Sequence, residues 1–311
     1  MAKILITESV HPIGPELLTA AGHTVVYADR DMDIIRREIV DADAVLVRII
    51  ELPGSLLATA KNLKIVSKHG VGYDNIDLDY CKSHGVAVTI TPNANSLSVA
   101  EHAFTLMLTL AKNIIPVSNE YRTVGFAAKN HAPGIEMTGK TLGLIGMGRI
   151  GKHILHMCRD GLDMHVIVYD PYISEVPEGV ERVDDLSELL RRADVVTLHC
   201  LLTDETRKLI DRERLALMKS TALLINCARG PIVDEAALIE ALENGRLAGA
   251  GLDVTDPEPV APDSPLFKLP NVIVTPHYAP TTVESATRVS KIAAENINAV
   301  LAGQEPAGRI V

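Results

Sequence analysis

The chain has 311 residues, which is enough for two domains with full cores, because a single core rarely grows beyond about 250 to 300 residues. Its hydrophobic content of 47% and its net charge of −10 are typical of a soluble globular protein without a disordered tail. The acidic balance argues against general nucleic-acid binding, which needs a basic face to displace counterions.

No apolar run is long enough to span a membrane, and no signal-peptide segment precedes the first expected strand at Lys3. We therefore expect a cytoplasmic protein whose chain starts near Met1. The four cysteines lie far apart and form no C-x-x-C pair, so we expect reduced, semi-buried thiols. His153, His156 and Cys158 lack a closing carboxylate, and we expect no metal site.

The first hundred residues alternate short apolar runs with amphipathic segments, a pattern that favours a parallel sheet covered by helices on both faces. The expected strands are Ile4–Thr7, Thr24–Tyr27, Ala44–Arg48, Lys64–Ser67 and Ala87–Thr91. The expected helices include Gly14–Ala21, Met32–Val40 and Ile76–His84.

The stretch "NSLSVAEHAFTLMLTLAKNI" then predicts one long helix, with Ser96 or Ser98 as its cap and an almost wholly apolar body. Such a helix must be buried, between domains or against another subunit. After an irregular segment (Thr123–Thr138), a second strand–helix series starts at Thr141, and a last helix (Val283–Leu301) closes the chain.

We expect two doubly wound α/β domains with a cleft between them. The first is discontinuous, residues 1–98 with 283–311, because the last helix returns to it, and the second is residues 99–282.

"KTLGLIGMGRIGKHILHMC" carries a dinucleotide fingerprint in its required context, a strand (Thr141–Ile145) that runs into glycines and then a helix. Gly146 makes the tight turn, Gly148 lets the backbone approach a pyrophosphate, and Gly151 allows close packing of helix on strand. The helix N-terminus offers N–H groups to the phosphates. A glycine turn without any ligand is the alternative.

The next strand carries the second half of this signal. "HVIVYDPY" ends in Asp170, nineteen residues after Gly151, where a carboxylate would accept hydrogen bonds from ribose hydroxyls. The same charge would repel the 2′-phosphate of NADP, so the two signals together predict NAD. The alternative for Asp170 is a turn residue before Pro171.

Three later strands supply candidates for chemistry at their carboxyl ends, where ligands bind in open α/β sheets. "LLINCARGPIVDEAAL" places Arg229 after one strand, "GAGLDVTDPEP" places Asp253, Asp256 and Glu258 after another, and "VIVTPHYAPTT" places His277 after a third. An arginine can hold a substrate carboxylate as a fork, and a carboxylate beside imidazole fixes its tautomer. Taken alone, a loop histidine is more often solvated, and the two aspartates are more often turn or capping residues.

With these residues assembled, the sequence resembles the D-isomer-specific 2-hydroxyacid dehydrogenase family over nearly the whole chain. The resemblance is carried, in order, by "HGVGYDNIDL", "SVAEHA", "LGLIGMGRIG", "LHCLLTDETRKLI", "MKSTALLINCARGPIVDEAALIEAL", "GAGLDVTDPEP" and "LPNVIVTPH". It implies a flavodoxin-like substrate-binding domain (1–98 plus 283–311), a Rossmann NAD-binding domain (99–282) and a homodimer formed through the cofactor domain.

The resemblance also implies roles. His277 is the acid/base, Glu258 is its partner, and Arg229 orients the substrate, while the N–H groups of Val71 and Gly72 receive the substrate carboxylate. The cofactor would contact Gly146, Gly148, Arg149, Ile150, Gly151, Asp170, Cys227 and Asp253. In the implied reaction, a hydride passes between nicotinamide and C2 of a 2-oxo acid while His277 moves the proton.

Lys68 and His69 precede the carboxylate loop, so they are either a solvated strand end or two donors that favour a small dianionic substrate. Leu201 stands where the family usually has proline, and Tyr278-Ala279-Pro280 departs from the usual small residues, so substrate preferences need not transfer. The other histidines, His102 and His199 among them, are interpreted as loop or packing residues. Alternative functions are an NAD(H)-sensing co-repressor on this fold, and formate or phosphite oxidation, which no feature favours.

Overall fold

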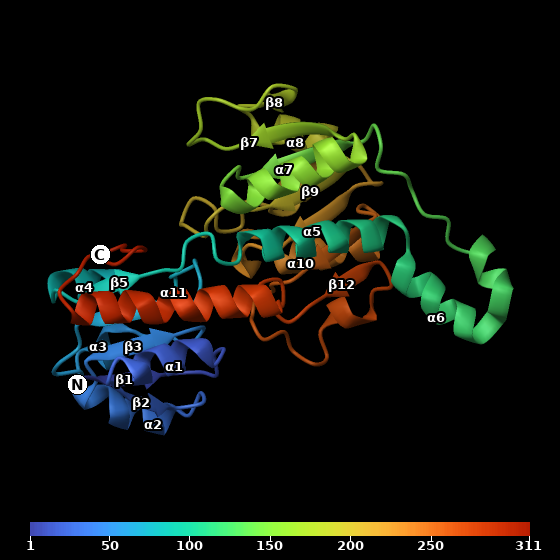
Figure 1. Ribbon diagram of the computed structural model, residues 1–311. Coiled ribbons are helices and arrows are strands. Elements are labelled where there is room, and N and C mark those ends of the chain that lie inside the picture. The colour runs from blue at the N-terminus through green and yellow to red at the C-terminus, as the bar shows by residue number, and fades with distance from the viewer. The chain divides into compact units, whose positions relative to one another are not determined.

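The computed structural model describes residues 1–311, which divide into two compact units (Figure 1). Unit 1 comprises Met1–Asn95 with Thr281–Val311, and unit 2 comprises Ser96–Pro280. Each unit is built on one parallel β-sheet, of five strands in unit 1 and seven in unit 2. None of the helices combines the length and the apolar character needed to cross a membrane.

The sheet of unit 1 has the strand order β2-β1-β3-β4-β5, the flavodoxin-like order. Its strands are β1 (Lys3–Ile6), β2 (Thr24–Tyr27), β3 (Ala44–Val47), β4 (Ile65–Lys68) and β5 (Ala87–Thr89). Its helices are α1 (Ile13–Ala20), α2 (Met32–Glu38), α3 (Gly54–Leu57), α4 (Leu78–Ser83) and α11 (Val283–Leu301), with a 3₁₀ turn, η1, at Ile39–Asp41.

Both faces of this sheet are buried, which explains its continuous apolar strands. One face packs on α2, α3 and α4 through residues such as Ile35, Leu57 and Cys81. The other packs on α1 and α11 through Leu18 and Ile297. Helix α11 therefore packs on the sheet of unit 1. It begins where the side chain of Thr282 caps it by accepting from the backbone N–H of Ser285.

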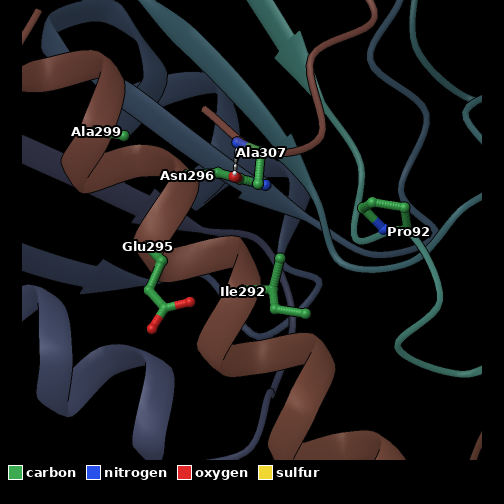
Figure 2. Close-up of a pocket in the computed structure, with 6 residues that line it drawn as sticks. All are labelled: Pro92, Ile292, Glu295, Asn296, Ala299 and Ala307. Atoms are coloured by element: carbon green, nitrogen blue, oxygen red, sulfur yellow. Dashed lines mark hydrogen bonds between the residues drawn. The ribbon is translucent and has the colours of Figure 1, made fainter. Parts of the chain in front are cut away.

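The segment after α11 is held to the edge of the sheet. Ile90 N–H donates to the carbonyl of Gly308, and Thr89 pairs with Arg309 in an antiparallel bridge. Asn296 of α11 accepts from Ala307 N–H at 3.1 Å and donates to the carbonyl of Ile90. A hollow of about 300 Å³ lies beside these contacts (Figure 2), lined by Pro92, Ile292, Glu295, Asn296, Ala299 and Ala307.

The sheet of unit 2 has the order β12-β11-β10-β9-β6-β7-β8, with every neighbouring pair parallel. Its strands are β6 (Thr141–Ile145), β7 (His165–Tyr169), β8 (Val180–Arg182), β9 (Val195–Leu198), β10 (Leu223–Asn226), β11 (Gly249–Leu252) and β12 (Val272–Val274). Its helices are α5 (Ser96–Ala111), α6 (Ile114–Val124), α7 (Arg149–Leu162), α8 (Leu186–Arg192), α9 (Arg212–Leu217) and α10 (Glu235–Glu243). Three 3₁₀ turns complete it, η2 (Gly125–Asn130), η3 (Gly230–Ile232) and η4 (Pro265–Lys268).

This is the Rossmann strand order with one further strand at the edge. The order reverses between β6 and β9, so the loops after these two strands diverge and leave room for a ligand at their carboxyl ends. One face of the sheet packs on α8, α9 and α10, and the other on α5 and α7. The glycine loop after β6 therefore lies at the position where open α/β sheets bind nucleotides.

The long apolar helix ends earlier than expected. Asn113 takes a left-handed conformation (φ 50°), so α5 stops at Ala111 and a separate helix, α6, follows. The burial of α5 is internal to unit 2, through Ala103, Leu106 and Met107 on its inner side. Helix α6 has no buried residue and extends away from the rest of unit 2 (Figure 1).

Candidate active site

The turn after β6 is as tight as its glycines predict. Gly146 has φ +90°, and a β-carbon there would lie 2.8 Å from the backbone of His199 and Cys200. A β-carbon on Gly151 would lie 2.3 Å from the carbonyl oxygen of Gly146, so this glycine lets α7 pack directly on the turn. Both positions therefore require glycine for packing alone.

Gly148 differs from these two. A β-carbon there would meet no atom within 4 Å, and the residue is exposed at the start of α7, beside the exposed Arg149 and the half-buried Ile150. No side chain caps this helix, so its first N–H groups remain available. Open space in front of a helix N-terminus fits the pyrophosphate of a dinucleotide.

Asp170 follows β7 and is half-buried. One of its carboxylate oxygens accepts from the N–H of Met147 in the glycine turn at 2.9 Å, and the other accepts from the N–H of Tyr172 at 3.0 Å. The side chain therefore acts as a turn residue, which was the alternative interpretation of Asp170. It also joins its strand end to the glycine loop. Each oxygen keeps a second lone pair, so the carboxylate retains the capacity to accept from a ribose hydroxyl.

Arg229 lies in the turn between β10 and η3. Asn226, the last residue of β10, fixes this turn with its side chain, which accepts from Ala228 N–H and donates to the carbonyl of Arg229. The guanidinium of Arg229 is half-buried and donates to the carbonyl of Ala228. Gly230 follows, and a β-carbon there would lie 1.9 Å from the carbonyl oxygen of Thr255. The Arg229 turn thus packs directly on the loop that carries Glu258.

His277 and Glu258 form a hydrogen-bonded pair, in which Nδ1 of the imidazole lies 2.7 Å from Oε1 of the carboxylate. A carboxylate only accepts, so the neutral ring carries its proton on Nδ1 and Nε2 is left to exchange a proton with a substrate. The two side chains are about a third exposed. The half-buried Glu235 supports the loop before Glu258, accepting from Asp256 N–H at 3.0 Å.

These groups come from neighbouring strands. Strands β10, β11 and β12 are parallel neighbours in the sheet. The loops that carry Arg229, Glu258 and His277 therefore follow adjacent strands at the same edge of the sheet. The edge combines a cation, an anion and an imidazole that can move one proton. Such a set can orient a carboxylate, polarise a neighbouring carbonyl and protonate the alkoxide that forms.

Asp253 and Cys227 are the other strand-end residues expected near the cofactor. Cys227 is buried, and burial raises the pKa of its thiol well above the ordinary value. Asp253 is 1% exposed, and its carboxylate is occupied by hydrogen bonds to the loop after β12. His102 on helix α5 also approaches this carboxylate, with 3.4 Å between Nε2 and Oδ1, a contact that its interpretation as a loop or packing residue did not include.

The glycine loop of unit 1 follows β4. The carbonyl of Gly70 accepts from the N–H and the hydroxyl of Thr91, which fixes the start of the loop. No carbonyl of the chain accepts from the N–H groups of Val71 and Gly72, and both residues are half-buried. Two adjacent unused donors are what a carboxylate needs.

Lys68 is not a solvated strand end. It is 7% exposed, and its ammonium donates to the carbonyl of Arg48 and, at 2.6 Å, to the side chain of Asn75. Asn75 in turn donates to the carbonyl of Ile50. Lys68 therefore connects the loop after β3 to the loop after β4.

His69 lies beside this cluster, with Nε2 buried and without a hydrogen-bond partner. Its pKa is lowered to about 4, mainly by burial and next by the positive charge of Arg48. Neither Arg48 nor Glu8 was identified from the sequence. The buried carboxylate of Glu8 accepts from the N–H groups of residues 48–50 and so shapes the loop after β3. Both residues are strand-end polar groups, which is the signal that could have identified them.

Known proteins are similar to this chain in sequence and in fold. The family model for the NAD-binding domain of D-isomer-specific 2-hydroxyacid dehydrogenases matches residues 104–279, which fall within unit 2. The chain is 42% identical over 308 residues to D-3-phosphoglycerate dehydrogenase of Methanocaldococcus jannaschii, covering 98% of this chain and 58% of that one. It is 38% identical over 319 residues to glyoxylate reductase of Thermofilum pendens, with 98% and 93% covered.

Among solved structures, D-lactate dehydrogenase from Aquifex aeolicus, complexed with NAD and lactic acid, superposes with a TM-score of 0.89. It is 31% identical, and the match covers 99% of each chain. The present chain spans little more than half the length of several phosphoglycerate dehydrogenases that it matches. The family model, the sequence identities and the shared fold lead to one conclusion: the chain belongs to the D-isomer-specific 2-hydroxyacid dehydrogenase family.

Proposed function

We propose that the protein is an NAD-dependent dehydrogenase that interconverts a D-2-hydroxy acid and its 2-oxo acid. The observation that carries the proposal is the His277–Glu258 pair, with 2.7 Å between Nδ1 and Oε1, on the strand edge that also bears Arg229. The pair has the geometry of a general acid with an orienting carboxylate. The relatives named above are dehydrogenases and a reductase, and they give no support to the co-repressor alternative.

Each residue of the site has a separate role in the proposed reaction. The bound nicotinamide would supply the hydride to C2 of the 2-oxo acid and accept it in the reverse direction. His277 donates the Nε2 proton of its imidazolium to the oxygen on C2, and Glu258 stabilises the ring while it is charged. Arg229 holds the substrate and stabilises the negative charge that develops on that oxygen. In oxidation, His277 removes the same proton as a base.

Residues of unit 2 would hold the cofactor. The N–H groups at the start of α7 and the open space at Gly148 suit the pyrophosphate, with Arg149 and Ile150 at its flank. Gly146, Gly151, Cys227 and Asp253 shape the wall of this site. Asp170 would accept from the ribose hydroxyls, and its charge favours NAD over NADP.

For the substrate, we assign the carboxylate to the N–H groups of Val71 and Gly72 and to Arg229. A second anionic group would find Arg48, Lys68 and the unpartnered Nε2 of His69 close to that loop. The ammonium of Lys68 already donates to the backbone carbonyl of Arg48 and to the side chain of Asn75. Its role here is therefore to add positive charge and to hold the loop after β4 in place. We therefore propose a small dianionic 2-oxo acid as the preferred substrate, supported by the similarity to a phosphoglycerate dehydrogenase.

The decisive experiment follows NADH absorbance with glyoxylate, pyruvate, hydroxypyruvate and its 3-phosphate as substrates. We expect turnover with at least one of these and the highest kcat/KM with the dianion. His277→Ala should lower turnover by at least about 100-fold while NADH still binds. His165→Ala, which changes an exposed histidine of the same unit, is the matched control. Near-normal turnover of His277→Ala would show that this residue is not the acid. Equal kcat/KM for pyruvate and for all the other substrates would contradict the proposal of a dianionic substrate.

We also propose that the protein is a homodimer assembled through unit 2. Helix α6 and the turn after it expose a series of large apolar side chains, which are Ile114, Ile115, Tyr121, Val124 and Phe126. Next to the base of α6, a small hollow is lined by Ile115, Pro116 and residues 270–273 around β12, the edge strand of the sheet. An apolar arm beside an uncovered sheet edge favours pairing with a second copy of the chain.

Analytical ultracentrifugation tests the dimer. We expect a stable dimer at micromolar concentration and a shift toward monomer for Phe126→Asp. Phe267→Asp is the matched control, since Phe267 is an exposed phenylalanine of unit 2 outside the arm. A monomeric unmodified protein would contradict the proposal.

A cytoplasmic location is the last part of the proposal. All four cysteines are free thiols, and burial raises the pKa of Cys81 to about 11 and that of Cys158 to about 12. Unpaired thiols are typical of a reducing compartment. Cell fractionation with an antibody to the protein tests the location.

A further inference from the structure

The loop that carries His277 is held in an unusual backbone conformation. His277 has φ +52°, the left-handed region that a non-glycine residue adopts only when its surroundings enforce it. Its ring therefore reaches Glu258 only as long as the backbone at this position is kept in that conformation.

Asp253 supplies the constraint. Its backbone carbonyl accepts from His277 N–H at 2.8 Å, and its carboxylate accepts from the N–H of Tyr278 at 2.7 Å and of Ala279 at 2.9 Å. Three successive N–H groups of the loop thus converge on one residue. Burial by itself would raise the pKa of Asp253, but the hydrogen bonds that it accepts outweigh this effect and lower the pKa, so the carboxylate stays ionised.

Two further side chains complete the network. The hydroxyl of Thr275, two residues before His277, donates to Oδ1 of Asp253 at 2.6 Å. Nε2 of His102, on helix α5, lies 3.0 Å from that hydroxyl and 3.4 Å from the same carboxylate oxygen. Because the hydroxyl proton is used on Asp253, the hydroxyl oxygen must accept from His102, which therefore carries a proton on Nε2.

His102 is well placed to fix this network from outside the loop. Its side chain is 17% exposed, and its ring meets that of Tyr278 edge-on at 6.1 Å between centroids. Helix α5 is packed on β11 and β12 through its apolar side, which makes it a rigid support. Without the imidazole, the Thr275 hydroxyl loses its donor and the buried carboxylate loses a proton donor nearby.

We infer that His102 is a positioning residue of the reaction: through Thr275 and Asp253 it holds the His277 loop in the conformation that aims the imidazole at Glu258 and at the substrate. The inference rests on the proposed function. A misplacement of the acid by an ångström costs up to about 100-fold in rate, so a residue remote from the reacting atoms can control turnover.

The test compares His102→Leu, which fills the space without a donor, with His102→Gln, whose side-chain amide can donate from the position of Nε2. We expect His102→Leu to lower kcat by about 10- to 100-fold and His102→Gln to restore most of it. NADH-binding stoichiometry, measured by the fluorescence of NADH, should stay at that of the unmodified protein. The solvent deuterium isotope effect on kcat should rise, since proton transfer from a misaligned His277 becomes slower.

Thr275→Val provides an independent test because it removes only the relaying hydroxyl. We expect this variant to resemble His102→Leu, and the double variant to be little worse than either single one, since the two residues act in one chain. Unchanged kcat in His102→Leu, failure of His102→Gln to restore it, or a loss of kcat matched by a loss of NADH-binding stoichiometry would overturn the inference. Failure of the unmodified protein to reduce any 2-oxo acid would instead overturn the proposed function.

Discussion

Two histidines with buried ring nitrogens, His69 and His199, should make the protein sensitive to mild acid. Burial lowers the pKa of His199 to about 3, and burial with the charge of Arg48 lowers that of His69 to about 4. In the unfolded chain both would titrate near the ordinary value of 6.5. When the pH falls below 6.5, the unfolded chain therefore takes up protons that the folded chain does not, and the equilibrium moves toward unfolding.

The size of the effect follows from these values. At pH 5 the folded rings are still mostly neutral, so each histidine costs about 1.4 kcal/mol for each of the 1.5 pH units below 6.5, or about 2 kcal/mol. The result depends little on whether the folded pKa is 3 or 4, because pH 5 lies above both values. The carboxylates of Asp253 and Asp194, whose pKa values are lowered from 3.8, begin to lose their contribution to stability only at lower pH.

Urea denaturation followed by circular dichroism at pH 7 and pH 5 measures the effect, since the chain has no tryptophan to report by fluorescence. We expect His199→Gln, which can keep a hydrogen bond to Thr197, to lose about 2 kcal/mol less than the unmodified protein between the two pH values. His165→Gln, at an exposed position, should lose as much as the unmodified protein. If His199→Gln keeps the full loss, the ring is not neutral by burial and the reasoning fails.

Three further predictions concern the site. Gly230→Ala should lower the free energy of unfolding by about 3 kcal/mol and reduce turnover, because its β-carbon would displace the backbone of Thr255 and the loop before Glu258; a stable, active variant in denaturation and kinetic assays would contradict this. Asp170→Ala should narrow the preference for NADH over NADPH in steady-state kinetics, and equal use of both cofactors by the unmodified protein would refute the role of the carboxylate. Glu258→Gln should slow reduction at neutral pH and move its optimum toward acid, since the imidazolium loses its anionic partner at 2.7 Å; an unchanged pH profile would exclude the pair from the reaction.

The apolar periodicity predicted both sheets, and the glycine spacing predicted the tight turn after β6. Both features could be predicted because each depends on residues that are close together in the sequence. Strand β6 begins and ends at the expected residues, and so does helix α11. The break at Asn113 was missed because a left-handed residue inside an apolar stretch leaves no trace in the hydrophobic pattern. The long helix was expected to be buried between domains or against another subunit, whereas the buried side of α5 packs on the sheet of its own unit.

The side-chain contacts of the site could be predicted only as far as strand order allowed. Arg229, a carboxylate after β11 and His277 could be brought together because the ends of three strands in one parallel sheet share an edge. The choice of Glu258 among the acidic residues after β11 came from the resemblance to the family. The interaction of His102 with Thr275 spans 173 positions in the sequence, and no local pattern reports it. The burial of Lys68 was equally hidden, because its acceptors are the backbone carbonyl of Arg48 in the loop after β3 and the side chain of Asn75 in the loop that follows Lys68 itself.

The discontinuity of unit 1 has a consequence for synthesis on the ribosome. Ser67 in β4 donates to the carbonyl of Ala293, and Ser290 donates to that of His11, so the first segment is completed by α11. Residues 96–280 must be translated in between, which takes about ten seconds or more at ordinary rates of elongation. Unit 2 can fold during that interval, whereas the α11-facing side of the first sheet, which includes Ile4 and Leu46, stays uncovered. The nascent chain therefore exposes an apolar sheet face, to which chaperones can bind, until α11 emerges from the ribosome.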